Sequence, residues 1–200
     1  MSELIFYTNP QSRGRIVRWM LEEVGVPYTT EILEYGTTMK SPEYLAINPM
    51  GKVPAIRHGD TVVTECAAIC AYLADAFPEA GLVPPPAERG SYYRWLFFAA
   101  GPLESAIMNT ALGFEVPEDK RMTVGYGTKD LALDAVETAI SGTPYVAGDT
   151  FSAADVYWGA QIAFGLQFGN VPKRDSFVAY VSRVTDREAY RKAAALDAAA

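Results

Sequence analysis

The chain has 200 residues, of which half are hydrophobic and 20% are charged, as in a globular protein that buries a sizeable core. Its formal net charge of −7 argues against a nucleic-acid surface, because such a surface needs a basic patch that displaces counterions. No apolar run approaches the roughly 20 residues that span a membrane, and the N-terminus lacks the pattern of a signal peptide. We therefore expect a cytoplasmic protein that binds neither nucleic acid nor membrane.

The first part of the chain alternates strand and helix signals. A short apolar run at 4–7 predicts a buried strand, and an apolar stripe over 16–24 predicts a helix. The β-branched and aromatic run at 28–33 predicts a second strand, so that the three elements form a parallel, right-handed βαβ unit. A short helix follows, in which Ser41 caps and Pro42 takes the first helical position.

A hairpin and a helix complete this region. The runs 53–56 and 61–64 predict two strands that are joined by a glycine–aspartate turn. Thr64 is the predicted N-cap of a helix that ends at Phe77, because the proline after it disfavours helical geometry. The order β-α-β, then β-β-α, predicts an α/β thioredoxin-like N-terminal domain over residues 1–77.

The remainder of the chain has a different pattern of residues. Residues 78–90 include three consecutive prolines and predict a stiff linker. Residues 91–200 carry long helical patterns without alternating strands, among them one at 119–140, and predict an all-α helical C-terminal domain. Gly101-Pro102 should kink its first helix, and Ser152 with Asp155 should form a capping box at a later one.

Four segments together resemble the cytosolic glutathione transferases, and the resemblance covers essentially the whole chain. NPMGKVPAI at 48–56 and TECAAICAYL at 64–73 are similar to the family's N-P-x-G-x-V-P and E-S-x-A-I-x-x-Y-L elements. SRGRIVRWMLEEVGVPY at 12–28 resembles the first helix of bacterial and fungal members. FSAAD at 151–155 resembles the capping box of the family's helical domain.

The resemblance implies a binding site for glutathione, which acts as a co-substrate. The residues it implies are Lys40, Lys52, Val53, Pro54, Glu65 and Cys66. It implies a cis bond before Pro54, with the Val53 backbone binding the cysteinyl part like an added strand. Glu65 would meet the γ-glutamyl ammonium, and the helix start at Cys66 would receive the γ-glutamyl carboxylate. Cys66 stands where serine is usual, so that a hydroxyl donor becomes a weaker S–H.

Several of these residues also have an ordinary structural interpretation. Glu65 is a carboxylate that favours the positive end of a helix, and Val53 suits a core strand. Lys40 and Lys52 are candidates for the glycyl carboxylate, but a lone lysine is usually a solvated side chain. Cys70, the other cysteine, is predicted to be a small buried hydrophobe.

Two hydroxyl groups compete to stabilise the glutathione thiolate. Ser12 opens the first helix, and Tyr7 ends the first strand; both fit members of the family without a gap. We favour Ser12, because it lies at the positive end of a helix and because the Ser12-Arg13 pair fits the serine-dependent, bacterial-type members. The alternatives are an ordinary N-cap for Ser12 and a core aromatic for Tyr7. Asn9 is a third, weaker donor, and Arg13 and Arg15 are candidates for adding positive potential near the thiolate.

The resemblance implies a homodimeric glutathione transferase that conjugates the glutathione thiolate to hydrophobic electrophiles in detoxification. A glutathione-dependent peroxidase or disulfide reductase is the alternative enzyme, and a non-catalytic ligand-binding protein of the same fold is the alternative from another class. No metal is expected, because the single histidine, His58, excludes a multi-histidine site. The sequence does not specify the electrophile.

Overall fold

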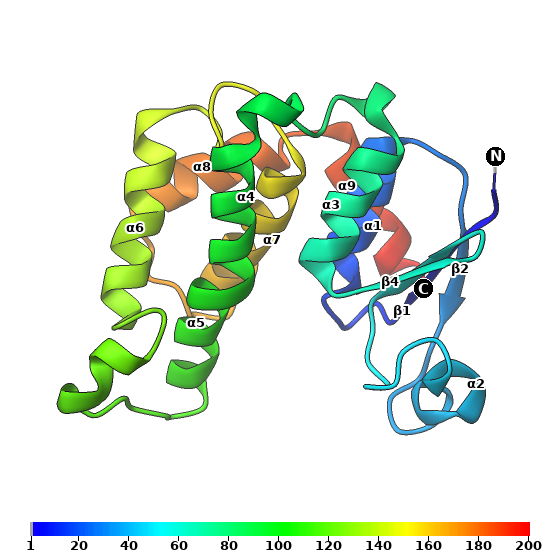
Figure 1. Ribbon diagram of the computed structural model, residues 1–200, viewed down its shortest axis with the longest axis horizontal. Coiled ribbons are helices and arrows are strands. Elements are labelled where there is room, and N and C mark those ends of the chain that lie inside the picture. The colour runs from blue at the N-terminus through cyan, green and yellow to red at the C-terminus, as the bar shows by residue number, and fades with distance from the viewer. Residues whose placement is uncertain (1) are drawn as a thin grey trace. The chain divides into compact units, whose positions relative to one another are not determined.

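The computed structural model describes residues 2–200, which form two compact units. The first unit runs to Leu82 and also takes in Asp186–Ala200, and the second is Val83–Thr185. The division falls within the stretch 78–90. The sequence assigned 91–200 to one helical domain, whereas the packing places Asp186–Ala200 with the first unit. The reason is the last helix, α9 (Glu188–Ala198), which lies beside the first helix of the chain (Figure 1).

A four-stranded mixed sheet organises the first unit. Its order is β2-β1-β3-β4, with bounds β1 Leu4–Thr8, β2 Thr29–Ile32, β3 Ala55–His58 and β4 Thr61–Thr64. Helix α1 (Gly14–Val24) connects β1 to β2, which run parallel, while the β1–β3 and β3–β4 pairs are antiparallel. The predicted βαβ unit and hairpin are therefore both present, as in a thioredoxin-like domain.

The first strand of the hairpin lies further along the chain than the prediction of 53–56. The ladder begins at the pair Ala55–Thr64 and ends at a two-residue turn that contains Gly59, whose φ is +58°. Pro54 precedes this ladder because it has no backbone N–H to donate to a neighbouring strand. The residues before Ala55 are consequently free of strand pairing and form a loop at the edge of the sheet.

The two faces of the sheet are covered differently. Phe6 faces α1, where the guanidinium of Arg18 lies 5.2 Å from the centre of its ring. Tyr7 faces the other way and packs in a buried cluster with Met39 and Tyr44. Those two residues belong to the helical turn η1 (Thr38–Lys40) and to α2 (Pro42–Leu45). The predicted cap of α2 is confirmed, since Tyr44 N donates to Ser41 Oγ at 3.3 Å.

Helix α3 (Cys66–Ala76) begins two residues after the predicted N-cap. Thr64 ends strand β4, where it pairs with Ala55, and so cannot also serve as the helix cap. The N-cap is Glu65, which has φ +69° and whose side chain caps nothing. Phe77 is the C-cap, in agreement with the helix end that Pro78 predicts.

A network of polar contacts fastens α9 to α1. Arg18 Nε donates to Asp197 Oδ1 at 2.6 Å, and both side chains are buried. Burial raises the pKa of the Asp197 carboxyl, and the neighbouring Arg18 acts in the opposite direction. Arg187 forms two bonds of 2.7 Å to the carboxylate of Glu23. The rings of Trp19 and Tyr190 meet edge to face at 4.9 Å.

The named elements of the second unit are all helices or helical turns. They are α4 (Arg89–Phe98), the π-helical turn η4 (Ala99–Leu103), α5 (Glu104–Ala111), the 3-10 turn η5 (Glu118–Thr123), α6 (Lys129–Gly142), α7 (Ala153–Gln167) and α8 (Asp175–Thr185). Further 3-10 turns are η2 (Pro78–Ala80) and, in this unit, η3 (Pro86–Glu88). Helix α7 is buried over most of its length and packs against α4 and α8. No helix among residues 2–200 is long and apolar enough to cross a membrane.

Three predictions for this unit can be compared with the structure. The expected interruption at Pro102 is confirmed as the π-helical turn between α4 and α5. The capping box is also confirmed, because Ser152 N donates to Asp155 Oδ2 at 3.0 Å. The single helix predicted at 119–140 is wrong: η5 and α6 are separated by a loop in which Gly127 has φ +64°, a conformation that ends regular helix.

The Arg18–Asp197 pair yields a prediction for stability. Arg18→Ala should lower the free energy of unfolding by about 3–5 kcal/mol, because it leaves a buried carboxylate without its cation. Lys192→Ala removes an exposed ammonium from Glu22 and should lower the free energy of unfolding far less than Arg18→Ala does, because solvent screens that pair. Denaturant unfolding followed by circular dichroism measures both.

The matched double variant separates charge from packing. Arg18→Met with Asp197→Leu should recover most of the loss, since an apolar pair pays no desolvation of charge. Equal losses for Arg18→Ala and Lys192→Ala would contradict the assigned importance of the buried pair.

Candidate active site

The register of the sheet brings the predicted site residues to one edge. Tyr7 pairs with Ala55, and Ala55 pairs with Thr64 on its other side. The segments that extend beyond these three positions are the loop after β1 with Ser12, the loop before β3 with Val53-Pro54, and the start of α3 with Glu65. Three stretches that are distant in sequence therefore end at the same place.

The loop before β3 is held in shape by its own polar groups. The backbone oxygen of Lys52 accepts bonds from Asn48 Nδ2 at 2.8 Å and from the Tyr44 hydroxyl at 2.6 Å. Asn48 Oδ1 also accepts a bond from Met50 N at 3.1 Å. Burial raises the pKa of Tyr44 to about 12, so its hydroxyl remains a donor at neutral pH. Tyr44 and Asn48, which donate these bonds to Lys52 O, are themselves buried. The loop is therefore a rigid support for Val53.

The peptide bond between Val53 and Pro54 is cis, as the family resemblance implied. Pro54 is buried, whereas Val53 is partly exposed and packs against the cluster that contains Tyr7. Val53 belongs to no strand of the sheet. Its backbone lies just outside the first ladder pair, where an extended peptide would continue the sheet.

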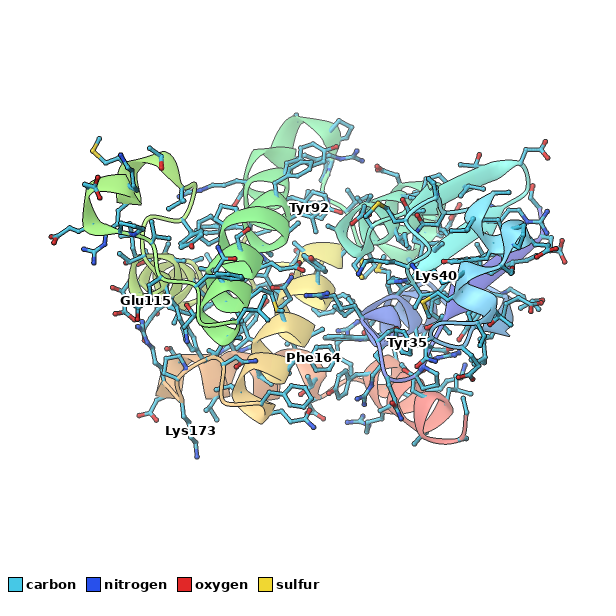
Figure 2. The ribbon with its side chains drawn as sticks, turned by 90° about the horizontal axis from the view of Figure 1, so that it is seen from below. Tyr35, Lys40, Tyr92, Glu115, Phe164 and Lys173 are labelled. Atoms are coloured by element: carbon cyan, nitrogen blue, oxygen red, sulfur yellow. The ribbon has the colours of Figure 1, made fainter. Side chains whose placement is uncertain are left out.

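Lys40 supports the same loop from the side. Its ammonium donates to the carbonyl oxygens of Met50 at 3.1 Å and Gly51 at 2.8 Å (Figure 2 labels Lys40). A lysine ammonium has three donors, so one remains after these two bonds. Lys52, in contrast, is exposed. The structure thus gives Lys40 a definite scaffolding contact that the sequence did not reveal.

The start of α3 has an unusual backbone conformation. Glu65 is exposed and has φ +69°, a region in which a residue with a side chain costs about 1–2 kcal/mol. Such residues cluster at functional sites. The Sγ atom of Cys66 donates to the backbone oxygen of Arg13 at 3.6 Å, which joins the start of α3 to the turn before α1.

The two cysteines differ in environment. Cys66 is 7% exposed and lies at the first helical position of α3. Cys70 is fully buried, and burial raises the pKa of its thiol well above the usual value. Cys70 therefore stays protonated and unreactive, in agreement with its predicted role as a small buried hydrophobe.

Ser12 lies in a tight turn whose bonds fix its hydroxyl oxygen. Ser12 Oγ accepts a bond from Gly14 N at 2.9 Å and donates to the backbone oxygen of Asn9 at 2.6 Å. It is partly exposed. The N-cap by position is Arg13, so Ser12 satisfies the first N–H of α1 from one residue further out. The oxygen is placed by Gly14, while its proton can turn from Asn9 to another acceptor by rotation about one bond.

Asn9 anchors this turn to the neighbouring strand connection. Its Nδ2 donates to the backbone oxygen of Leu33 at 2.9 Å, and its Oδ1 accepts a bond from Gln11 N at 2.9 Å. Gly14 is required at the other end, because a Cβ atom there would lie 1.9 Å from Thr8 Oγ1. The asparagine amide is thus committed to the fold, which weakens its case as a third donor to a thiolate.

Tyr7 has the environment of a core residue. It is 9% exposed, and its ring centre lies 5.7 Å from that of Tyr44. It points to the face of the sheet that α2 covers, whereas α1 lies on the opposite face.

The sequence did not predict the supporting contacts of Asn48, Tyr44 and Asn9. A signal existed for Asn48 only, because the Asn-Pro pair that begins four residues before Lys52 is typical of a turn. Among residues 2–200 no group of three or more histidine, cysteine, aspartate or glutamate side chains is arranged to bind a metal ion.

Comparison with known proteins defines the family. Residues 12–76 match the model of the glutathione S-transferase N-terminal domain. The chain is 33% identical over 150 residues to glutathione S-transferase F10 of Arabidopsis thaliana, covering 68% of each chain. It is 30% identical over 158 residues to glutathione S-transferase GST-4.5 of Xanthomonas campestris pv. campestris, covering 76% of this chain and 77% of the relative.

Solved structures agree with this result. A glutathione transferase from Methylococcus capsulatus superposes with a TM-score of 0.81 at 29% identity, covering 98% of this chain and all of the other. A homologue from Sulfitobacter, solved with bound glutathione, gives a TM-score of 0.74 at 28% identity, covering 96% and 97%. The chain belongs to the glutathione S-transferase family, an enzyme family whose two-part architecture it shares.

The loop before β3 yields a second prediction. Gly51 has φ +55°, and a Cβ atom there would lie 2.9 Å from the backbone oxygen of Met39. Gly51→Ala should therefore lower the free energy of unfolding by more than the ~1 kcal/mol expected from backbone conformation alone. Gly36→Ala is the control, because Gly36 has φ +76° but a Cβ atom there would have no neighbour within 4 Å. Thermal unfolding measures both, and an equal loss for the two variants would contradict a crowded loop.

Proposed function

We propose that this chain conjugates glutathione to hydrophobic electrophiles and that the Ser12 hydroxyl stabilises the glutathione thiolate, as in serine-dependent, bacterial-type members of the family. The observation that carries the proposal is the meeting of Ser12, Val53 and Glu65 at one edge of the sheet, set by the pairs Tyr7–Ala55 and Ala55–Thr64. The Sulfitobacter homologue with bound glutathione supports glutathione as the co-substrate.

The chemistry needs a thiolate in place of a thiol. A free thiol has a pKa of about 8.5, so only a few per cent is ionised at pH 7. Each unit by which the pKa falls stabilises the reactive form by about 1.36 kcal/mol. A hydroxyl donor next to the start of a helix stabilises the anion without a general base. The sulfur then attacks the electrophilic carbon, a C–S bond forms, and the leaving group departs with its electron pair.

Ser12 is suited to this role by its two existing bonds. Gly14 N keeps the oxygen in place, and only the proton now donated to Asn9 O has to turn toward the sulfur. That exchange gives up one neutral hydrogen bond, worth about 1 kcal/mol, for a charge-assisted one, worth about 1.5–3 kcal/mol. Tyr7 has no comparable position, because its ring lies in the core cluster on the α2 side of the sheet.

The remaining site residues bind glutathione in this proposal. Val53 pairs its backbone N–H and C=O with the cysteinyl part, in the position opened by Pro54. Glu65 meets the γ-glutamyl ammonium, while the first N–H groups of α3, beginning at Cys66, receive the γ-glutamyl carboxylate. Lys52 and the third donor of Lys40 serve the glycyl carboxylate. The positive φ of Glu65 is explained if it presents this carboxylate to the ligand.

The proposal extends to assembly and location. We infer a cytoplasmic homodimer that acts in detoxification, from the family to which the chain belongs. Hydrophobic electrophiles are the proposed second substrates. A glutathione-dependent peroxidase or disulfide reductase would use the same thiolate with a different acceptor, so the two activities are separated by assay rather than by the thiolate site.

The catalytic hydroxyl gives a direct test. Mixing glutathione with the protein should produce the ultraviolet absorbance of a thiolate at pH 7, and Ser12→Ala should lose it while lowering kcat/KM by about 10- to 100-fold. Tyr7→Phe, the matched control, should retain the thiolate band. A band lost in Tyr7→Phe and kept in Ser12→Ala would reverse the assignment, and no band in the wild type would overturn the proposed activity. Parallel assays with an aryl halide and with a hydroperoxide distinguish a transferase from a peroxidase.

Cys66 gives a test of the binding part. Cys66→Ser should tighten glutathione binding by about tenfold, because a hydroxyl is a stronger donor to a carboxylate than a thiol is. Isothermal titration calorimetry measures the Kd. Ala68→Ser adds a hydroxyl at an exposed position of the same helix and should leave the Kd unchanged. Unchanged affinity in Cys66→Ser would mean that the side chain at this position does not touch the ligand.

A further inference from the structure

We propose that Thr8 is a positioning residue for the reaction: its hydroxyl takes over the hydrogen bond to the Asn9 carbonyl when the Ser12 hydroxyl turns toward the glutathione sulfur. This inference rests on the proposed function, which requires the Ser12 proton to leave Asn9 O. Thr8 is the last residue of β1 and lies four positions before Ser12. Neither the sequence nor the proposed function gives the Thr8 side chain a role.

Three donors meet at the backbone oxygen of Asn9. Ser12 Oγ donates to it at 2.6 Å, and Ser12 N donates to it at 3.0 Å. Thr8 Oγ1 is the third donor, at the much longer distance of 3.5 Å. A carbonyl oxygen has two lone pairs, and a hydroxyl donor normally lies about 2.7–2.8 Å from its acceptor. The two bonds from Ser12 therefore occupy the oxygen, and the Thr8 hydroxyl is left with a poor bond.

The Thr8 hydroxyl is enclosed by the protein. Thr8 is fully buried, and Asn9 is 7% exposed. A Cβ atom on Gly14 would lie 1.9 Å from Thr8 Oγ1 and 3.0 Å from Ser12 Oγ, so the two hydroxyl groups flank the same small space. A buried hydroxyl without a short hydrogen bond costs free energy and calls for an explanation, of which a part in catalysis is one.

Rotation of the Ser12 hydroxyl vacates one lone pair of Asn9 O. Gly14 N keeps the Ser12 oxygen in place while its proton turns to the sulfur. The Thr8 hydroxyl then moves closer to Asn9 O and makes the bond that Ser12 has given up. Each hydroxyl keeps its own hydrogen atom, so only hydrogen bonds are exchanged. Because Asn9 O is not left without its second donor, the turn of Ser12 costs less and the thiolate is favoured.

Ser12→Ala tests the geometry in the absence of glutathione. This variant removes one of the three donors permanently, so Thr8 should take the vacated lone pair. A crystal structure of the full-length variant should show Thr8 Oγ1 about 2.8 Å from Asn9 O, in place of 3.5 Å. A distance that stays at 3.5 Å overturns the inference.

Thr8→Val tests the effect on the thiolate, since valine has a similar shape and no hydroxyl. Ultraviolet titration should show the pKa of the bound glutathione thiol raised by about half to one unit, as expected for the loss of one neutral hydrogen bond. Below that pKa, kcat/KM should fall about threefold to tenfold. It should approach the wild-type value as the pH rises above it, because the thiol then ionises without help.

Thr30→Val is the matched control. Thr30 lies on β2 in the same unit, and its Oγ1 accepts a bond from Arg18 Nη1 at 3.3 Å. Its loss should leave the thiol pKa unchanged. Thr8→Ser, which returns a hydroxyl to the site, should bring the thiol pKa back toward the wild-type value. Circular dichroism checks that each variant is folded, and the distance in Ser12→Ala still decides if Thr8→Val is not.

A double variant separates positioning from a merely structural role. Thr8→Val combined with Ser12→Ala should have the same kcat/KM as Ser12→Ala alone, because Thr8 acts through Ser12. A further loss of about threefold or more in the double variant overturns the inference.

The failure of this inference differs from the failure of the proposed function. No thiolate absorbance in the wild type overturns the proposed function and, with it, the role of Thr8. A thiolate that forms in the wild type with the same pKa in Thr8→Val overturns the inference about Thr8 alone.

Discussion

The pairing of β3 between β1 and β4 is the constraint on which the candidate active site depends. Ala55 lies opposite both Tyr7 and Thr64, so three chain segments leave the sheet at the same edge. A slip of one residue in either ladder would exchange the two faces and separate Ser12 from Glu65. Pro54 protects this register, because a proline cannot extend the ladder by one more pair. Strand pairing alone therefore brings the segments that carry Ser12, Val53 and Glu65 to the same edge of the sheet.

Around that edge, side chains support the backbone groups that we propose to bind glutathione. Lys40, Tyr44 and Asn48 all bond to backbone oxygens of the loop that precedes Pro54. Asn9 does the same for the turn that contains Ser12. The effect is that Val53 and the start of α3 present their backbone atoms from rigid segments, and such preorganisation lowers the entropy lost when an extended peptide binds.

The helix that carries Ser12 at its start is itself held by distant residues. Arg18 contacts Asp197 at the end of the chain, and Glu23 binds Arg187. Asp155 is the corresponding buried carboxylate of the second unit, where it accepts bonds from Val146 N and from the Tyr180 hydroxyl, both at 2.8 Å. Burial raises the pKa of Asp155, and these donors oppose the shift. In both units, specific donors offset the cost of burying a carboxylate.

The sequence by itself determined the elements whose cause is local. The βαβ unit, the two-residue turn at Gly59, the interruption at Pro102 and the Ser152–Asp155 box follow from propensity, turn chemistry and capping. Four segments together, at 12–28, 48–56, 64–73 and 151–155, indicated the family. What only the tertiary structure decided was long-range. Thr64 pairs with Ala55 in the sheet, so Glu65 rather than Thr64 is the N-cap of α3. Helix α9 belongs to the first unit because Asp197 forms an ion pair with Arg18, which is distant in sequence. Such contacts are set by packing between elements, which no local pattern of residues encodes.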